Sequence, residues 1–416
     1  MKVGLTRRGL LAGASALTAA GCAGFPAAGH PSAAHERIRA LVEAGEVPAA
    51  GLVVRRGGRI VFSHAAGLAQ GAGGEAAPVL FGADTKMRIA SVSKLAVALI
   101  AHRLGATGLV DIDADVSAAF DPPLRHPEFP DAPVTLRHLL SHTAGLQDPD
   151  VYWMAAPGRT EGLFTPAMWR PAEAGPPGSA FKYANFGYGL AAHVLESATG
   201  MRLDRLVAQN VLCGSGLDCG FNWSGVPRAQ RQAGATLYAF EENAWQPQAD
   251  GPAVLASETP AILSEAGFDL ANYVPGTNGT LFSPQGGLRA SLQDMLTLAR
   301  LAASEPMMTE PVWTHDPATD ADDTDAGYFS RFTAGAQVHP ADDSPIPGLK
   351  LLGHHGEAYG LYSAAFHAPD LDAEFAFAVT GTKANGAARA ERHPVVVKAT
   401  DPLWESVAEI LRSGGL

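Results

Sequence analysis

Ser91 and Lys94 have the residue types and the spacing of a catalytic pair. They stand three residues apart, where a strand-like run becomes a helix-like one, in the segment Met87-Arg88-Ile89-Ala90-Ser91-Val92-Ser93-Lys94. In a helical turn, positions i and i+3 share one face, so the hydroxyl and the amine can meet. A serine hydroxyl needs a neighbouring base to become a nucleophile, and a buried lysine gives up its proton readily enough to serve. The alternative is a surface helix with an ordinary serine and lysine.

A second pattern, Tyr183-Ala184-Asn185, lies at an expected loop-to-helix junction. A tight turn there can aim the phenol and the amide at one site. The phenol can relay protons between the serine and a leaving group, and the amide can hold Lys94 and a substrate carbonyl. The alternative is a helix capped by Asn185, with Tyr183 packed against it.

A third pattern is Gly353-His354-His355-Gly356, followed by Glu357. Gly356 lets the backbone approach a ligand closely, and the N–H of Glu357 can join that of Ser91 as an oxyanion hole. His354 would place a partly charged imidazole beside them. A metal centre needs further ligands, and no His-Glu-x-x-His occurs. We therefore expect neither a metal nor another cofactor.

Length and charge narrow the function classes. The 416 residues, 47% of them hydrophobic, are enough for a large core and more than one domain. The formal net charge is −12, and no Lys/Arg run is present. Both nucleic acid and anionic membranes attract basic patches, so we expect neither as a general partner.

Residues 1–30 are typical of an export signal. Thr6-Arg7-Arg8-Gly9-Leu10-Leu11 is similar to a twin-arginine signal, and the apolar segment that follows is too short to span a bilayer. Ala19-Ala20-Gly21-Cys22 is similar to a lipoprotein cleavage site, although alanine stands where leucine is usual. The sequence predicts an exported, periplasmic protein. Either Cys22 carries a lipid, which would be its only membrane contact, or the signal is cleaved shortly after Gly21.

The two remaining cysteines, Cys213 and Cys219, are six residues apart. In an oxidising compartment such a pair can close a small disulfide loop, and two free thiols are the alternative. Metal binding is disfavoured because no second pair accompanies them. The Asp-rich run at 316–325 lacks the glycine and the terminal glutamate of a calcium loop, so we interpret it as a solvated loop.

The elements predict an α/β fold of the α+β type, with an antiparallel sheet flanked by N- and C-terminal helices. A helix over 34–44 precedes two strands joined by Gly57-Gly58, and residues 65–77 are expected to be loop. Strands return over 332–338, 361–367 and 374–380, and a last helix starts with Asp401 as N-cap and Pro402 as its first residue. We expect a discontinuous α/β domain (31–110 and 285–416) and a mainly helical inserted domain with long loops (111–284), in which 223–260 is a surface excursion.

Taken in order along the chain, these patterns resemble a known superfamily. Ser91-Val92-Ser93-Lys94, Tyr183-Ala184-Asn185 and His354-His355-Gly356 are similar to the three motifs of the serine β-lactamases and penicillin-binding proteins, most closely the class C-like branch. Residues 139–146 resemble its Leu-Leu-x-His-Thr-Ser-Gly-Leu segment. Residues 285–294 resemble its Gly-Gly-Leu-x-Ser-x-x-Asp helix start, with one extra residue before the serine. The resemblance runs from about residue 34 to residue 411 and implies the β-lactamase/transpeptidase-like fold.

The resemblance also implies roles. Ser91 would be the acyl-accepting nucleophile, with Lys94 and Tyr183 sharing the acid and base work in an order that the sequence leaves open. Asn185 would orient Lys94 and substrate, His354 would act electrostatically, and Gly356 would shape the strand edge. His142, within residues 139–146, is interpreted as a structural hydrogen-bonder.

The resemblance implies an exported serine hydrolase that acts on a small ester, amide or peptide. Histidine at 354, where most β-lactamases and peptidases of the superfamily carry lysine, favours a carboxylesterase or D-aminopeptidase-like enzyme. A β-lactamase or D,D-carboxypeptidase is the alternative. A non-catalytic cell-wall peptide or penicillin-binding sensor is the alternative of another class. The substrate itself and the oligomeric state are not indicated.

Overall fold

The computed structural model describes residues 33–319, 321–325, 327–383 and 394–413. The expected signal segment 1–30 and Cys22 lie outside the described residues. Within these ranges, no helix is both long and apolar enough to cross a membrane. The division into a discontinuous α/β domain and an inserted helical domain stays a prediction.

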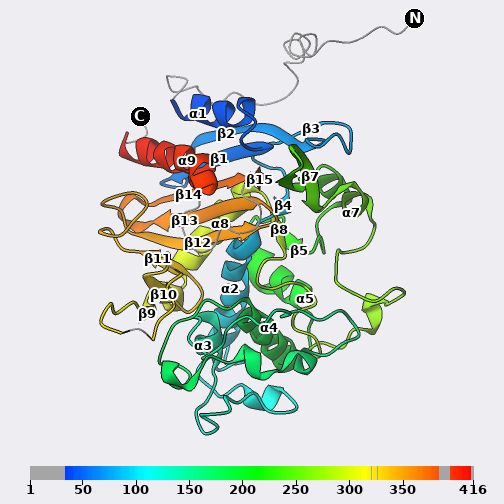
Figure 1. The fold of residues 1–416 in the computed structure, drawn as a ribbon, viewed down its shortest axis with the longest axis vertical. Coiled ribbons are helices and arrows are strands. Elements are labelled where there is room, and N and C mark those ends of the chain that lie inside the picture. The colour runs from blue at the N-terminus through cyan, green and yellow to red at the C-terminus, as the bar shows by residue number, and fades with distance from the viewer. Residues whose placement is uncertain (1–32, 320, 326, 384–393, 414–416) are drawn as a thin grey trace, which may run out of the picture. The chain divides into compact units, whose positions relative to one another are not determined.

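A nine-stranded antiparallel sheet forms the upper half of the molecule and confirms the expected fold class (Figure 1). β1 and β14 pair from Ala50↔Val379 to Arg56↔Ala373, so segments from the two ends of the chain lie side by side. The strand order is β3-β2-β1-β14-β13-β12-β11-β10-β9. The bounds are β1 (Ala49–Arg56), β2 (Arg59–Gln70), β3 (Val79–Leu80), β9 (Pro311–Thr314), β10 (Arg331–Thr333), β11 (Gln337–His339), β12 (Leu351–Ala358), β13 (Leu361–Ala368) and β14 (Ala373–Val379).

Helices cover both faces of this sheet. α1 (Ala33–Glu43) and α9 (Pro394–Arg412) lie on one face, and α8 (Leu292–Ser304) lies on the other. The alternation of β14 explains the asymmetry, because successive strand side chains point to opposite faces. Its Phe375 and Phe377 pack towards α1 and α9, whereas Ala376 and Ala378 face α8. Small side chains on that face let α8 approach the strands closely.

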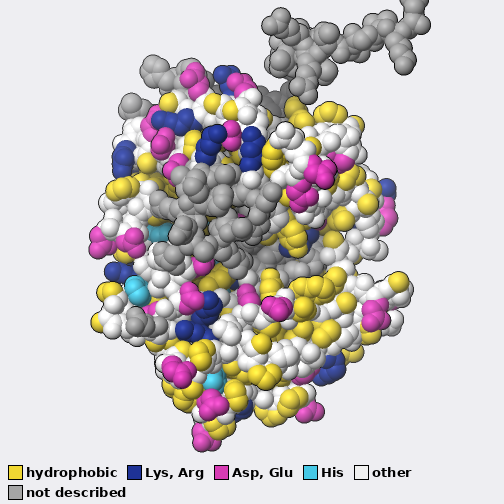
Figure 2. Space-filling view, viewed as in Figure 1, with side chains coloured by type: hydrophobic (Ala, Val, Ile, Leu, Met, Phe, Trp, Pro, Cys, Tyr) yellow, Lys and Arg dark blue, Asp and Glu magenta, His cyan; other side chains and the backbone are white. Residues whose placement is uncertain are grey.

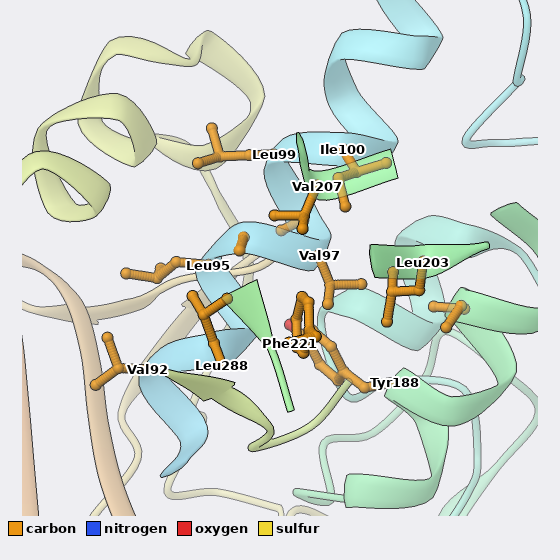
Figure 3. Close-up of a cluster of buried hydrophobic side chains, with 14 of the residues drawn as sticks. Val92, Leu95, Val97, Leu99, Ile100, Tyr188, Leu203, Val207, Phe221 and Leu288 are labelled. Atoms are coloured by element: carbon orange, nitrogen blue, oxygen red, sulfur yellow. The ribbon is translucent and has the colours of Figure 1, made fainter. Parts of the chain in front are cut away.

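Helix α2 (Lys94–Ala106) begins at the candidate pair of Ser91 and Lys94, and its mainly apolar side chains are buried along most of its length. Figure 3 shows its side chains surrounded by those of other elements. A helix that is hydrophobic all round belongs in a core, which here holds the Ser91–Lys94 turn firmly. The contributing elements are α4 (Asn185–Thr199), α5 (Leu203–Val207), β5 (Gly220–Phe221) and β8 (Leu288–Ala290).

The start of α8 follows from its sequence. The Ser291 hydroxyl accepts a hydrogen bond from the N–H of Asp294, and the Asp294 carboxylate accepts one from the N–H of Ser291, which is a capping box. Lys86 Nζ lies 2.6 Å from the same carboxylate in a buried ion pair. The cap therefore also fixes the strand that leads to Ser91.

The expectations for two elements are wrong. α9 starts well before Asp401 and keeps Pro402 in its interior, because Leu403, Val407 and Leu411 bury an apolar face that offsets the missing hydrogen bond. β2 continues to Gln70, into the expected loop.

Residues 223–260 are not simply a surface excursion. Trp223 is buried, and β6 (Leu237–Glu241) and β7 (Ala244–Ala249) form a hairpin in this segment. β6 pairs in parallel with β15 (Gly381–Thr382), which follows β14 directly in the chain. The segment is therefore joined to the main sheet through β15. The remaining short helices are α3 (Leu136–Leu140), α6 (Arg228–Gln232) and α7 (Pro252–Ala256).

The lower half of the molecule carries apolar surface. Figure 2 shows hydrophobic side chains gathered over the region of α4 and α5 on the face in view. Large apolar side chains that are exposed within 111–284 include Val151, Trp153, Leu263 and Val274. The long loops of this segment therefore do not bury all of their hydrophobic residues.

Glu196 of α4 gives the fold a pH dependence. Its buried carboxylate accepts hydrogen bonds from the Tyr273 hydroxyl and from the N–H groups of Leu203 and Gly276. Burial outweighs these bonds and raises the pKa of Glu196 to about 7. The folded state therefore favours the protonated form of Glu196. The contribution of this group to the stability of the fold is fully present below the unfolded pKa near 4.5, and it is lost as pH rises through about 7.

We predict that Glu196→Gln removes this dependence. We compare the free energies of unfolding of the two proteins. The difference, wild type minus variant, should fall by about 1–3 kcal/mol between pH 5 and pH 8, because a shift of one pKa unit corresponds to about 1.4 kcal/mol. Urea denaturation of both proteins at the two pH values measures this. Parallel pH profiles would show that Glu196 does not titrate with folding.

Candidate active site

Ser91 lies in a 3₁₀ turn, Ala90–Ser93, between β4 (Met87–Arg88) and α2. Ala90, just before it, adopts φ +46°, a strained backbone conformation for a residue with a side chain. Lys94 Nζ donates hydrogen bonds of 2.9 Å to each of Ser91 Oγ, Asn185 Oδ1 and the carbonyl of Gln285. Three acceptors match the three donors of an ammonium. A neutral amine in the same place could instead accept the Ser91 proton.

Asn185 is the first residue of α4, and it is not the N-cap that the alternative interpretation required. The N-cap is Ala184, without a side-chain cap. The Asn185 amide bridges two groups, because Oδ1 faces Lys94 and Nδ2 donates to Asp148 Oδ2 at 2.9 Å. Asp148 Oδ1 also accepts from the N–H of Phe186 at 2.8 Å. A carboxylate from a distant loop thus satisfies the helix N-terminus and fixes the amide's orientation.

Asp148 was not found from the sequence. It lies in a loop, in Gln147-Asp148-Pro149-Asp150, and no spacing relates it to Asn185.

We predict that Asp148→Ala lowers kcat about 10- to 100-fold with a smaller change in KM, because the released amide no longer orients Lys94. The loss of the helix-terminal contact should cost about 1 kcal/mol of stability. Steady-state kinetics with thermal denaturation tests both, and an unchanged kcat would limit Asp148 to a capping role.

Tyr183 stands beside the pair. Lys94 Nζ lies 4.8 Å from the centroid of its ring. On one side the ring stacks on Phe329, with centroids 4.9 Å apart, and on the other it contacts His142 at 4.3 Å. These contacts hold the aromatic ring of Tyr183 over the Lys94 amine, and the proton relay through its hydroxyl stays a prediction.

His142 is structural, as expected. It adopts φ +60°, and its Nδ1 accepts a hydrogen bond of 3.1 Å from the N–H of Ala184. Burial, with the nearby Lys94, lowers the pKa of His142 well below its usual value. The neutral ring therefore anchors the turn between Tyr183 and Asn185.

The expectation of a partly charged His354 is wrong. Burial and the neighbouring Lys94 ammonium lower the pKa of His354 to about 3. The ring is neutral at ordinary pH, with Nδ1 donating to the carbonyl of His355. Nε2 is then an acceptor, and it is buried without a hydrogen-bond partner. The ring centroid lies 6.1 Å from that of Tyr183.

Gly356 of β12 lies close to the backbone of the turn that holds Ser91. A Cβ at this position would lie 3.1 Å from the backbone nitrogen of Ser91 and 2.5 Å from the carbonyl oxygen of Ile89. The next peptide N–H is that of Glu357. The strand edge thus stands where a second oxyanion donor is needed, and the use of the Ser91 and Glu357 N–H groups stays a prediction.

The other residues singled out from the sequence have no place in this site. The structure leaves Cys213 and Cys219 as free thiols, the first exposed and the second buried, and so takes the free-thiol alternative. In the described ranges, no group of three His, Cys, Asp or Glu side chains is arranged to hold a metal ion.

The Asp-rich loop is more than solvated surface. The Asp322 carboxylate accepts hydrogen bonds from the N–H of Phe181 at 2.8 Å and from Trp313 Nε1 at 2.9 Å, and Asp323 forms an ion pair with Lys182. The loop therefore fastens the segment that leads into Tyr183.

Comparison with known proteins shows to which family this chain belongs. The family model described as Beta-lactamase matches residues 34–400. The chain belongs to the β-lactamase family.

Relatives of this β-lactamase family member include hydrolases of several kinds. A D-aminopeptidase from Cereibacter sphaeroides is 24% identical over 299 residues, which cover 69% of this chain and 48% of that protein. The chain thus spans about half the length of that relative. Esterase EstB from Burkholderia gladioli is 39% identical over 105 residues, 24% of each chain. The D-amino acid amidase from Ochrobactrum anthropi SV3, complexed with L-phenylalanine, shares the fold with a TM-score of 0.63 at 17% identity, covering 91% of this chain and 99% of the amidase.

Proposed function

We propose that the protein is a serine hydrolase that forms an acyl-enzyme at Ser91 and acts on small esters or amides, among them D-amino acid amides. One observation carries this proposal, namely the 2.9 Å contact of Lys94 Nζ with Ser91 Oγ, oriented by Asn185. The family membership and the relatives named D-aminopeptidase, esterase and D-amino acid amidase support it.

In the acylation step, Ser91 Oγ attacks the substrate carbonyl carbon while its proton passes to Lys94 in its neutral amine form, or to Tyr183 in its phenolate form. The carbonyl oxygen becomes an oxyanion, which the N–H groups of Ser91 and Glu357 would stabilise. Tyr183 returns the proton to the leaving amine or alcohol as the carbonyl–leaving-group bond breaks. Water then attacks the acyl-enzyme by the same route in reverse, which releases the acid and restores Ser91.

The neutral His354 favours esters and amides over the alternative of a β-lactamase or D,D-carboxypeptidase. A neutral acceptor can take a hydrogen bond from a substrate N–H or O–H, but it offers no positive charge to a carboxylate on the leaving-group side. A non-catalytic sensor is disfavoured because binding alone does not require Lys94 to hold Ser91, Asn185 and Gln285 together.

A panel of substrates tests the proposal. The full chain should hydrolyse p-nitrophenyl butyrate and D-alanine p-nitroanilide at readily measured rates, and nitrocefin slowly by comparison. Intact-mass spectrometry of the quenched ester reaction should show the butyryl group on the protein. No turnover of any of the three would overturn the proposal, and dominant nitrocefin hydrolysis would favour the β-lactamase alternative.

We also propose that the protein is exported to the periplasm. The twin-arginine-like segment and Cys22 support this. Mass spectrometry of the mature N-terminus would separate a lipidated Cys22 from ordinary cleavage after Gly21, and an intact Met1 would contradict export.

A further inference from the structure

Arg88 lies three residues before Ser91, and the reaction described above does not use it. Its side chain is partly exposed, and Nη1 donates a 3.1 Å hydrogen bond to the carbonyl of Gly286. The guanidinium carbon lies 5.1 Å from the centroid of the Tyr359 ring, which is half exposed in the turn between β12 and β13. Arg88 thus ends the short strand β4, which leads into the turn of Ser91.

Arg88 forms no ion pair in the described part of the chain, although the negative charge of the buried Asp250 favours its charged form. Its neighbour in the sheet, Arg289, is bound by Asp250 at 2.7 and 3.1 Å. Asp250 also accepts from Trp223 Nε1 at 3.0 Å, so its oxygens are occupied. The three ionised groups leave one net positive charge beside the site.

Arg88 also has donors to spare. A guanidinium has five N–H groups, and one of them binds Gly286. Nε is buried without a hydrogen-bond partner. Burial and the Arg289 guanidinium lower the pKa of Arg88 to about 10, which leaves the group charged at neutral pH. A charged, under-bonded guanidinium is a strong receptor for a carboxylate, which can accept two parallel hydrogen bonds.

Backbone contacts place this guanidinium next to the catalytic pair. Lys94 binds the carbonyl of Gln285, and Arg88 binds the carbonyl of the following residue, Gly286. A Cβ on Gly286 would lie 3.6 Å from Ala90, the residue before the nucleophile. The two cations therefore hold consecutive carbonyls of one turn.

The direction of β12 decides which part of a substrate faces Arg88. The His354 ring lies 6.1 Å from that of Tyr183, the proposed donor to the leaving group. Tyr359 lies five residues beyond His354, just past the end of β12, which at about 3.3 Å per residue is far from that pair. A substrate that lay along β12 with its leaving group at Tyr183 would direct its acyl chain towards Tyr359.

We propose that Arg88, flanked by Tyr359, binds a carboxylate on the acyl portion of the substrate, so that monoesters or monoamides of dicarboxylic acids are preferred over neutral esters and over D-amino acid amides, whose acyl ammonium the guanidinium would repel. This inference rests on the proposed function. The Tyr359 ring covers one side of the guanidinium and limits its hydration, which strengthens its hydrogen bonds to an anion.

Two esters of similar size test this specificity, namely mono-p-nitrophenyl glutarate, which carries the carboxylate, and p-nitrophenyl hexanoate, which does not. The measured quantity is the ratio of their kcat/KM values. Arg88→Met should lower the ratio about 10- to 100-fold, the range expected for a hydrogen-bonded charge, and Arg88→Lys should restore part of it. Arg37→Met is the matched control, because it removes one positive charge from α1, on the opposite face of the sheet, and should leave the ratio within twofold.

The outcomes are distinct. An unchanged ratio in Arg88→Met would overturn the inference and leave Arg88 as a support of the Gly286 turn. If neither ester is hydrolysed by wild type, the proposed function fails instead.

If the Arg88 variants do not fold, inhibition of the wild-type protein tests the inference instead. Monomethyl glutarate, an anion, should inhibit hexanoate ester hydrolysis at concentrations at least tenfold lower than neutral dimethyl glutarate. Equal inhibition by the two would overturn the inference.

Discussion

Replacing Ser91 by alanine is expected to lower kcat/KM for p-nitrophenyl butyrate by about 10⁴-fold or more, the loss typical of removing a catalytic nucleophile. The hydroxyl is the atom to which the acyl group would be transferred, and no other group in the site can take that place without moving. Lys94 would keep its contacts with Asn185 and Gln285, so the rest of the site should stay assembled. Stopped-flow or steady-state assays measure the rate, and intact-mass spectrometry should find no acyl-protein.

Ser93 provides a matched control on the same turn. It is fully buried, and its Oγ accepts a 3.0 Å hydrogen bond from the N–H of Leu288. Ser93→Ala leaves that N–H unpaired, which should cost about 1–3 kcal/mol of stability while the nucleophile remains. Equal turnover by wild type and Ser91→Ala would refute the acyl-enzyme mechanism. A loss as large in Ser93→Ala would show only that the turn had collapsed.

Gly356→Ala is expected to lower kcat/KM about 100-fold or more, a magnitude in the range for lost oxyanion stabilisation. The added Cβ would lie 2.5 Å from the carbonyl oxygen of Ile89 and 3.1 Å from the backbone nitrogen of Ser91. It would also collide with Ser363 Oγ, which donates a 3.0 Å hydrogen bond to that same carbonyl. Two of these three neighbours are backbone and cannot rotate away, so β12 must move from Ser91. Overpacking of this kind should also cost about 1–3 kcal/mol of stability.

Gly105 of α2 is the control for this substitution. The nearest atoms to a Cβ there are Ile112 Cγ2 at 3.5 Å and the carbonyl oxygen of Val110 at 3.6 Å, which are ordinary contacts. Gly105→Ala should leave kcat/KM unchanged and stabilise the helix by up to about 1 kcal/mol. Chemical denaturation alongside the kinetics separates the two effects of Gly356→Ala. Full activity of that variant would show that β12 does not form part of the site.

The neutral His354 and the charged Arg88 together determine which part of a substrate can carry a carboxylate that this site recognises. Next to Tyr183 the site offers an unpaired imidazole nitrogen, and towards Tyr359 it offers a guanidinium without an acidic partner. If the inference holds, Arg88 adds a positive charge on the acyl side of Ser91, and His354 adds none on the leaving-group side. This arrangement is the basis for expecting acidic acyl groups to be preferred.

The sequence by itself determined the features that depend on local spacing. Ser91 and Lys94 meet because they are three residues apart in a helical turn, and α8 begins where Ser291 and Asp294 form a capping box. The β1–β2 hairpin follows from Gly57-Gly58, and α4 ends at Gly200, in the left-handed conformation that glycine favours. These features need no partner from elsewhere in the chain.

Tertiary structure alone decided the features that depend on burial or on distant neighbours. The charge state of His354 is set by its burial beside Lys94, and the orientation of Asn185 is set by Asp148 from a separate loop. Pro402 lies inside a helix because packing against the sheet outweighs its local preference. Arg88 has no ion pair among the described residues because Asp250, the acid whose charge acts on it, binds Arg289. The charges in the site depend on which groups the fold buries and which ones it brings together as partners. The spacing of residues along the chain does not predict either.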